Sequence, residues 1–170
     1  YKILKNRQIK GIPKVYEIIE DEKELIIIEE YIHGLTLDKK YNKTDVETVK
    51  KIMEQLCNIL KQLHNMNPPI IHRDIKPTNI IVSNDDVVYL VDFNISREYD
   101  ENQSVDTVIM GTQGYASPEQ CGFAQTDCRS DIYSIGMLMK NILMVDEYPD
   151  KETSTLLLLG YCSPPYHTKA

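Results

Sequence analysis

The chain has 170 residues, a formal net charge of −7 at pH 7 and 42% hydrophobic residues. This length suits one domain with a real hydrophobic core, and the ordinary apolar content excludes a disordered chain. The acidic balance argues against a general binder of nucleic acids or anionic membranes, so we expect no nucleic-acid partner. No apolar run approaches the length of a membrane span, and the first residues show no apolar signal segment. We therefore expect a cytoplasmic protein without a membrane segment.

Two β-rich runs near the start of the chain predict a β-hairpin. Residues 14–20 and 24–30 are rich in β-branched side chains, and the polar turn 21–23 joins them. The preceding segment, Tyr1–Gln8, has a composition compatible with the end of a helix. Residues 11–13, Gly-Ile-Pro, would break that helix.

The segment 45–66 predicts an amphipathic helix. Its apolar residues recur three and four positions apart, as they do on one face of a helix; they are Val46, Val49, Ile52, Met53, Leu56, Ile59, Leu60 and Leu63. Thr44 or Asp45 can cap its N-terminus, and Asn-Pro-Pro at residues 67–69 would end it. We interpret His64, near that end, as a surface or packing residue rather than a ligand.

A second hairpin is predicted in the middle of the chain. Residues 80–82 and 87–91 are short β-rich runs, and the polar turn 83–86 separates them. A loop precedes the first run and another follows the second. Such a hairpin brings Asn79 and Asp92, which flank it, to the same rim.

Two carboxylates, one amide and one ammonium group would converge at that rim. Asp74 and Lys76 lie shortly before Asn79, and Asp92 follows the hairpin. Carboxylate and amide oxygens are hard ligands that suit Mg²⁺, and a lysine offers a point positive charge for phosphate. This corner is therefore the candidate functional site of the chain.

The second half of the chain predicts a long loop and one more helix. Residues 95–117 are polar and lack any period, which in a loop of this length is typical of a functional segment. Residues 130–145 are apolar nearly all round, as a buried central helix should be, with Ser130 or Asp131 in its first turn. Residues 153–170 show no helical period, and we interpret them as an atypical tail that reflects a truncation or a change of reading frame.

Four motifs along the chain resemble those of eukaryotic-type (Hanks-type) serine/threonine protein kinases. Residues 72–79 match the catalytic-loop pattern H-R-D-x-x-x-x-N, and Asp92-Phe93 begins the metal-binding D-F-G motif. Residues 111–119 resemble the end of the activation segment, and residues 127–136 resemble the start of the family's long buried helix. The order and spacing of the four make the resemblance specific, and it covers about residues 1–149.

The resemblance implies a truncated protein-kinase-like α+β fold, with a mostly helical C-lobe and a small β-hairpin remnant of the N-lobe. It divides the chain into a partial kinase domain, residues 1–152, and the tail, residues 153–170. Within the domain, residues 1–30 would be the N-lobe remnant, and residues 31–152 would form the hinge and the C-lobe.

The same resemblance implies transfer of the γ-phosphate of ATP to the Ser or Thr hydroxyls of a protein substrate. Asp74 would accept or orient the hydroxyl proton, and Lys76 would hold the migrating phosphoryl group. Thr112 would help to orient both side chains. Asn79 and Asp92 would bind Mg²⁺.

The nucleotide would lie between the hinge and this corner. Glu30 and Ile32 would contact the adenine edge through backbone groups, and Ile81 would form an apolar floor beneath the ring. The phosphates would meet Lys76 and the two metal ligands. The resemblance also implies structural roles for three residues: a packing pair, His72 with Phe93, and a carboxylate on Asp131 that accepts backbone N–H groups of the catalytic loop.

Three positions depart from the family's pattern. Glu29 stands at the back of the nucleotide pocket, where the family usually has an apolar side chain, and it can equally be interpreted as a solvated charge at a strand end. Asn94 replaces the glycine of D-F-G, and asparagine tolerates the left-handed backbone that this turn needs. Ser117 replaces the alanine of A-P-E.

The sequence contains neither a glycine-rich phosphate loop nor the lysine strand that the family places before the hinge. We therefore expect this piece to transfer phosphate poorly by itself. Two other interpretations stay open: a non-catalytic kinase-like scaffold or binding module, and a small-molecule phosphotransferase with the same metal motifs. Lys76 and residues 111–119 favour a protein substrate over a small molecule.

Overall fold

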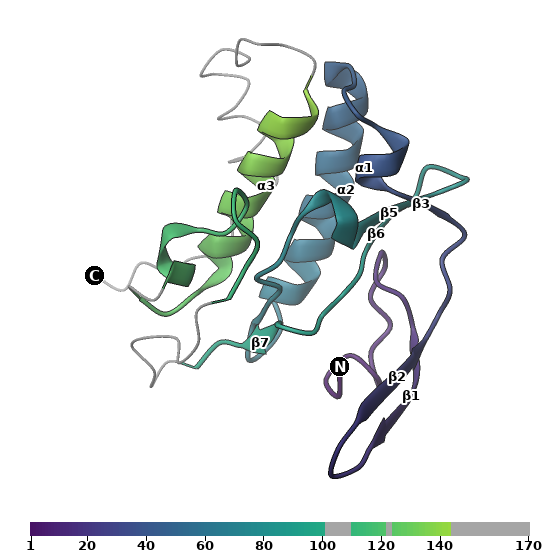
Figure 1. Ribbon diagram of the computed structural model, residues 1–170, viewed down its shortest axis with the longest axis vertical. Helices are drawn as coiled ribbons and strands as arrows, with labels where there is room; N and C mark the ends of the chain where they lie inside the picture. The colour runs from purple at the N-terminus through teal and green to yellow at the C-terminus, as the bar shows by residue number, and fades with distance from the viewer. Residues whose placement is uncertain (101–109, 122–123, 144–170) are drawn as a thin grey trace.

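The computed structural model describes residues 1–100, 110–121 and 124–143. The strands and helices follow in the order β1, β2, β3, α1, α2, β4, β5, β6, β7 and α3, with 3₁₀ turns at Pro77–Asn79 and Pro118–Cys121. Two long helices, α2 and α3, run side by side, and the β1–β2 hairpin projects beside them (Figure 1). The described residues thus form the expected α+β arrangement, with a helical body and a small hairpin.

The predicted first hairpin is present. β1 (Val15–Glu20) and β2 (Leu25–Glu29) pair antiparallel. Asp21 closes the turn between them, because its carboxylate accepts hydrogen bonds from the backbone N–H groups of Lys23 and Glu24, both at 2.8 Å. This local Asx-type bonding is why the polar run interrupts the strand pattern there.

The segment before β1 is a single turn rather than the end of a regular helix. The backbone N–H groups of Leu4 and Lys5 donate to the Tyr1 carbonyl at 2.9 and 3.0 Å, and no helix follows. The bond from Lys5 to Tyr1 has the i→i+4 spacing of a helix end, but Tyr1–Gln8 contains no regular helix of its own, since one turn fixes many dihedral angles for few hydrogen bonds. Leu4 instead anchors the segment, with its side chain in the hydrophobic core.

The predicted amphipathic helix is α2 (Val46–His64), and its cap is Asp45. The Asp45 carboxylate accepts the Thr48 backbone N–H at 3.0 Å and the Thr48 hydroxyl at 2.8 Å. Val46 is 44% exposed although the pattern put it on the apolar face, since it lies in the first turn, ahead of the packed part of the helix. The buried face consists of Val49, Ile52, Met53, Leu56, Cys57, Ile59, Leu60 and Leu63.

The second predicted hairpin consists of β5 (Ile80–Ser83) and β6 (Val88–Leu90). Ile80 and Val82 are buried in the core, whereas Ile81 is only partly buried. Side chains alternate along a strand, so Ile81 points to the face opposite the core.

The short elements β3 and α1 were not predicted. β3 (Gly34–Thr36) pairs antiparallel with β5, and α1 (Leu37–Lys40) follows at once. Gly34 permits this pairing, because a Cβ at that position would collide with the carbonyl oxygen of Val82. Elements of three and four residues are too short to show a hydrophobic period.

The predicted second helix is α3 (Cys128–Ile142), and its N-cap is Asp127, whose carboxylate accepts the Arg129 backbone N–H at 2.7 Å. α3 packs against α2. β4 (Ile70–Ile71) pairs with β7 (Arg97–Glu98), so the long polar segment opens with a short strand.

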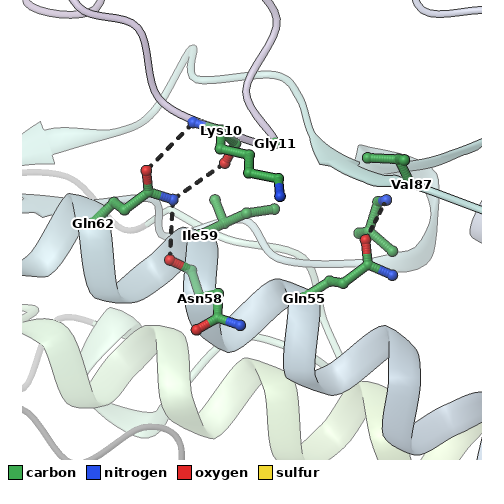
Figure 2. A pocket seen from close by; sticks show the side chains of 8 residues that line it. Lys10, Gly11, Gln55, Asn58, Ile59, Gln62 and Val87 are labelled. Carbon is green, nitrogen blue, oxygen red and sulfur yellow. Dashed lines mark hydrogen bonds between the residues drawn. The ribbon is translucent and has the colours of Figure 1, made fainter.

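Two glutamines of α2 hold neighbouring segments by their backbones (Figure 2). The Gln62 amide accepts the Lys10 N–H at 3.3 Å and donates to the Lys10 carbonyl at 3.2 Å, while Gln55 accepts the Val88 N–H at 3.0 Å. A small pocket lies between the two glutamines. One helix therefore fixes both the segment before β1 and the β5–β6 hairpin.

Among the residues that the structure describes, none of the helices has the length and apolar character needed to cross a membrane. The predicted tail, residues 153–170, lies outside the described residues, as does the predicted helix beyond residue 143. The division of the chain near residue 152 stays a prediction.

Shortening a core side chain of α2 should destabilise the protein. Leu60 is 1% exposed, so Leu60→Ala should lower the free energy of unfolding by about 2–5 kcal/mol, through lost burial and the cavity that remains. Val46→Ala on the same helix is the matched control and should change it by less than about 0.5 kcal/mol. Urea unfolding followed by circular dichroism measures both, and equal losses would contradict the packing of α2.

Candidate active site

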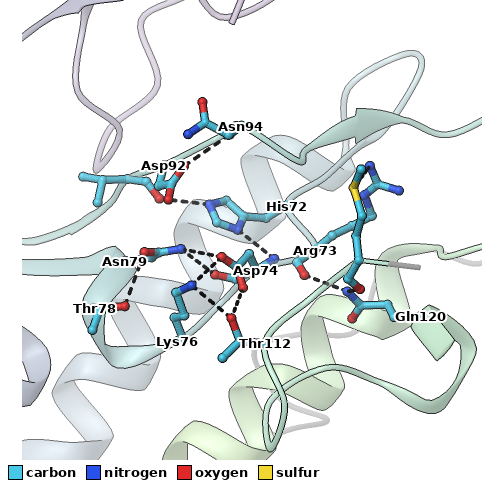
Figure 3. A network of polar contacts seen from close by, with 12 residues as sticks. His72, Arg73, Asp74, Lys76, Thr78, Asn79, Asp92, Asn94, Thr112 and Gln120 are labelled. Carbon is cyan, nitrogen blue, oxygen red and sulfur yellow. Dashed lines mark hydrogen bonds and ion pairs between the residues drawn. The ribbon is translucent and has the colours of Figure 1, made fainter. Parts of the chain in front are cut away.

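The loop that joins β4 to β5 carries a tightly held carboxylate (Figure 3). One oxygen of Asp74 accepts a hydrogen bond from the Thr112 hydroxyl at 2.7 Å. Its other oxygen lies 2.8 Å from the Lys76 ammonium and accepts the Asn79 amide at 3.0 Å. Lys76 also lies 3.0 Å from the Thr112 hydroxyl oxygen. The structure therefore brings four predicted site residues into direct contact.

These partners set the charge of Asp74. Partial burial opposes its ionisation, but the hydrogen bonds from Lys76 and Thr112, with the charge of Lys76, outweigh burial and hold the pKa of Asp74 below its ordinary value. Asp74 is consequently an anion at neutral pH. Such a group can accept a hydrogen bond from a hydroxyl and orient it.

A buried carboxylate on α3 holds the backbone of this loop from below. Asp131 is fully buried and accepts the backbone N–H groups of His72 at 3.0 Å and Arg73 at 2.9 Å. Arg73 has a left-handed φ of 68°, which few residues adopt without such support. The role that the resemblance implied for Asp131 is confirmed by these two hydrogen bonds.

His72 is a buried, neutral packing residue. Its ring meets the Phe93 ring edge-on at 4.7 Å between centroids, so the expected packing pair is confirmed. Burial lowers the pKa of His72. Because Nε2 lies 3.2 Å from the Val91 carbonyl, which can only accept, Nε2 carries the proton and Nδ1 accepts the Asp74 backbone N–H at 3.3 Å.

The rim of the second hairpin holds the two predicted metal ligands. The Val91 N–H donates to the Asn79 carbonyl at 3.0 Å, so Asn79 and Asp92 flank the same end of the hairpin. The Asn79 Nδ2 atom donates to Asp74, which leaves its Oδ1 atom turned the other way, toward the Thr78 hydroxyl at 3.5 Å. One amide oxygen and one carboxylate suit Mg²⁺, which binds few protein ligands and completes its shell with phosphates and water.

The tight turn after β6 places its strain on Asp92 rather than Asn94. Asp92 has a φ of 65°, and Asn94 is not among the described residues with positive φ. The turn is thus feasible with Asn94, as expected, but it does not draw on the tolerance of asparagine for left-handed backbone. The Asn94 N–H lies 3.4 Å from the Asp92 carboxylate, a long contact. Aspartate tolerates this backbone region better than most residues do.

The residues predicted to contact the nucleotide lie on other elements than the catalytic loop. Glu30 and Ile32 lie in a segment of no regular structure between β2 and β3. The Glu30 backbone N–H donates to the Lys14 carbonyl at 2.8 Å, which ties this segment to β1. Ile81 is on the partly buried face of β5. The structure brings these three residues into no direct contact with Asp74.

Glu29, the unusual residue at the end of β2, is exposed. Neighbouring protein atoms and the negative charge of Asp92 nevertheless raise its pKa. The pKa of the Tyr1 hydroxyl is also raised, mainly by burial and further by the charges of Glu29 and Asp92. This hydroxyl accepts the Phe93 backbone N–H at 3.1 Å. Glu29 is therefore an exposed residue at a strand end whose charge is repelled by that of Asp92, and its place in a nucleotide pocket stays a prediction.

The role of His64 was not evident from the sequence. Its side chain is only 5% exposed, and Nε2 lies 2.8 Å from Asp131 Oδ2. Burial opposes a charge on the ring, but the hydrogen bond with Asp131, a further hydrogen bond with Cys128 and the charge of Asp131 outweigh it and raise the pKa of His64 to about 9. The only sequence signal was a polar residue in the last turn of a helix that packs on α3, and the partner lies 67 positions away.

The fold and the site together define a protein kinase domain. A hinge follows a small hairpin, a helical body supports a catalytic loop, and the loop's aspartate, lysine and asparagine contact a threonine from the activation segment. The protein kinase domain family matches residues 1–157 of the chain. The chain therefore belongs to the protein kinase family.

Curated relatives agree with this assignment. The chain is 35% identical over 131 residues to a probable serine/threonine-protein kinase of Clostridium acetobutylicum, which covers 76% of this chain and 20% of that protein. It is 33% identical over 165 residues to serine/threonine-protein kinase A of Synechocystis, with 88% and 31% covered. It is 30% identical over 156 residues to myosin light chain kinase 2 of Rattus norvegicus, with 86% and 25% covered. The chain spans between a fifth and a third of the length of these relatives.

The His64–Asp131 pair predicts how stability depends on pH. The pKa of His64 is about 9 in the folded protein and 6.5 as the reference value. The contribution of protonated His64 to the free energy of unfolding should therefore be complete below about pH 6.5. It should disappear as the pH rises through 9, a loss on the order of 3 kcal/mol. The pH dependence due to Asp131 runs in the opposite direction. Its pKa is lowered in the folded protein, so its contribution to the free energy of unfolding is lost in acid.

Urea unfolding between neutral pH and pH 9 measures this loss. His64→Gln should be less stable than the natural protein at neutral pH and should lose less stability over the alkaline range. The exposed His33 provides the control variant His33→Gln, which should keep the natural pH dependence. A parallel decline in His64→Gln and the natural protein would contradict the pair.

Proposed function

We propose that the protein of which this chain is part is a serine/threonine protein kinase, which transfers the γ-phosphate of ATP to hydroxyl groups of a protein substrate. The observation that carries the proposal is the Asp74 carboxylate, held by Lys76, Thr112 and Asn79 at 2.7 to 3.0 Å. The names of the relatives, all serine/threonine-protein kinases or a myosin light chain kinase, support the same chemistry.

In the proposed reaction, a substrate hydroxyl oxygen forms a bond to the γ-phosphorus as the bond to the β-phosphate oxygen breaks. Asp74 accepts a hydrogen bond from that hydroxyl and aims its lone pair, and the proton passes to Asp74 or onward from it. Lys76 stabilises the negative charge of the phosphoryl group in transit. Thr112 fixes both side chains, so catalysis rests mostly on positioning and charge.

The nucleotide and metal are proposed to occupy the hairpin rim. Asn79, through Oδ1, and Asp92 would hold Mg²⁺, which would supply positive charge to offset that of the phosphates. Backbone groups of Glu30 and Ile32 would contact the adenine edge, and Ile81 would lie beneath the ring. The proposed place of action is the cytoplasm, with ATP as the phosphoryl donor.

A non-catalytic scaffold is the competing proposal, and Glu29 is the observation in its favour. A carboxylate close to Asp92 adds negative charge where the phosphates would bind, and this weakens nucleotide affinity. The intact contacts of Asp74 argue the other way, because a binding module has no need of an ionised, oriented aspartate. Activity and nucleotide binding distinguish the two.

Asp74→Asn should remove phosphoryl transfer while leaving nucleotide binding in place. The amide keeps the shape of the side chain but lowers its capacity to accept a proton, so kcat for a Ser/Thr peptide should fall by about 10²–10⁴-fold. A kinase assay on the full natural protein with Mg²⁺-ATP measures kcat, and a fluorescent ATP analogue measures affinity. Full activity in this variant would exclude the proposed role of Asp74.

The Thr112 hydroxyl should matter more than the methyl group beside it. Thr112→Val keeps the shape but removes the hydrogen bonds to Asp74 and Lys76, and kcat should fall roughly ten- to hundredfold. Thr112→Ser keeps the hydroxyl and should retain most of the activity. Peptide phosphorylation rates compare the two variants, and equal rates would mean that the hydroxyl does not orient Asp74.

A further inference from the structure

A buried glutamine beneath the candidate active site has every polar atom of its side chain engaged (Figure 3). Gln120 is 3% exposed. Its Nε2 donates to the carbonyls of Arg73 at 2.7 Å and Met110 at 3.0 Å, and its Oε1 accepts the backbone N–H and the hydroxyl of Ser117, both at 3.1 Å. The two carbonyls need donors and the Ser117 N–H needs an acceptor, so the partners fix the orientation of the amide.

One of these contacts holds the peptide group that leads into Asp74. The carbonyl of that peptide belongs to Arg73 and accepts from Gln120, while its N–H belongs to Asp74 and donates to the His72 ring at 3.3 Å. The Arg73 backbone N–H is itself bound to Asp131. The peptide plane is therefore held at both ends, and its plane decides the direction in which the Asp74 side chain leaves the backbone.

The other contacts hold the activation segment on both sides of Thr112. Met110 lies before Thr112 and Ser117 lies after it, and both bind the Gln120 amide. Gly111 makes room for this packing, because a Cβ there would lie 2.7 Å from Gln120 Nε2. Thr112 then reaches the Asp74 carboxylate at 2.7 Å. One amide thus sits between the two segments that meet at the carboxylate.

Ser117 gains an explanation from the same geometry. It stands where related kinases usually have alanine, and its fully buried hydroxyl donates to Gln120 Oε1. A buried hydroxyl without a partner would be costly. The serine and the glutamine therefore form a matched pair, in which the hydroxyl completes the acceptor side of the amide.

We propose that Gln120 is a positioning residue that couples the end of the activation segment to the orientation of Asp74. This rests on the proposed phosphoryl transfer, since positioning is expressed in the rate of that reaction. Gln120 touches neither the substrate hydroxyl nor the phosphates. It acts through the Arg73 carbonyl on one side and through Met110 and Ser117 on the other.

The test uses the full natural protein and the isosteric variant Gln120→Glu. A carboxylate accepts but cannot donate, so the Arg73 and Met110 carbonyls lose their donor and face a negative charge. We expect kcat to fall at least about tenfold and the KM for ATP to stay within about twofold, because the hinge and the metal ligands are not involved. Gln8→Glu makes the same change at an exposed position and should leave both values unchanged.

A pH series separates positioning from a general loss of folding. Burial beside two carbonyl oxygens favours the protonated form of the introduced carboxyl group, which can donate one hydrogen bond. The ratio of the kcat of Gln120→Glu to that of the natural protein should therefore rise from mildly alkaline to mildly acidic pH. A ratio that stays constant, or a kcat equal to that of the natural protein, would overturn the proposal.

Amide hydrogen exchange tests, without relying on activity, whether Gln120 couples the activation segment to the catalytic loop. In Gln120→Glu, exchange should quicken together in residues 110–117 and 72–79, and Ser117→Ala, a milder change, should give a smaller effect in the same two segments. Exchange that changes in one segment alone would overturn the coupling. If the natural protein transfers no phosphate, the proposed kinase function fails, and the exchange data still decide the role of Gln120.

Discussion

The contact between the Asp131 carboxylate and the catalytic-loop backbone is the constraint on which the site depends. A fully buried charge is costly unless it is well bonded, and Asp131 accepts two backbone N–H groups and the His64 ring. Its place in the first turn of α3 adds favourable interaction with the helix dipole. Since the backbones of His72 and Arg73 are bound to α3 in this way, the backbone at Asp74, from which its carboxylate extends, has a defined position. Breaking such a buried pair typically costs about 3–5 kcal/mol, so the position of the catalytic loop depends on its contact with α3.

The same helix also receives the activation segment. Ser130 donates to the Glu119 carboxylate at 2.6 Å, and Ser134 donates to the Tyr115 carbonyl at 2.9 Å. The polar residues that interrupt the apolar surface of α3 are therefore those that hold the two functional segments. Burial of so many polar groups in one helix makes sense because each of them has a partner from a loop. α3 therefore positions both the catalytic loop and the end of the activation segment.

Much of this could be predicted from sequence because it depends on local patterns. The 3.6-residue period of α2, its Asp45 cap and the two hairpins all arise from neighbours in the chain, and the spacing of the kinase motifs located Asp74, Asn79 and Asp92. What escaped prediction depends on distant partners. His64 and Gln120 look like ordinary polar residues until Asp131 and Arg73 are brought beside them. Likewise, β3 and β7 are too short to show a hydrophobic period. They form because β3 pairs with β5 and β7 pairs with β4.

The central claim is that this fold presents one amide oxygen and one carboxylate to a single magnesium ion beside an oriented aspartate. Anomalous diffraction from crystals of the full natural protein grown with Mn²⁺ and a non-hydrolysable ATP analogue tests it most directly. The account predicts a manganese peak at coordination distance from both Asn79 Oδ1 and the Asp92 carboxylate, with the terminal phosphate on the side of Asp74 and Lys76. A nucleotide bound with its metal away from these two residues would contradict it.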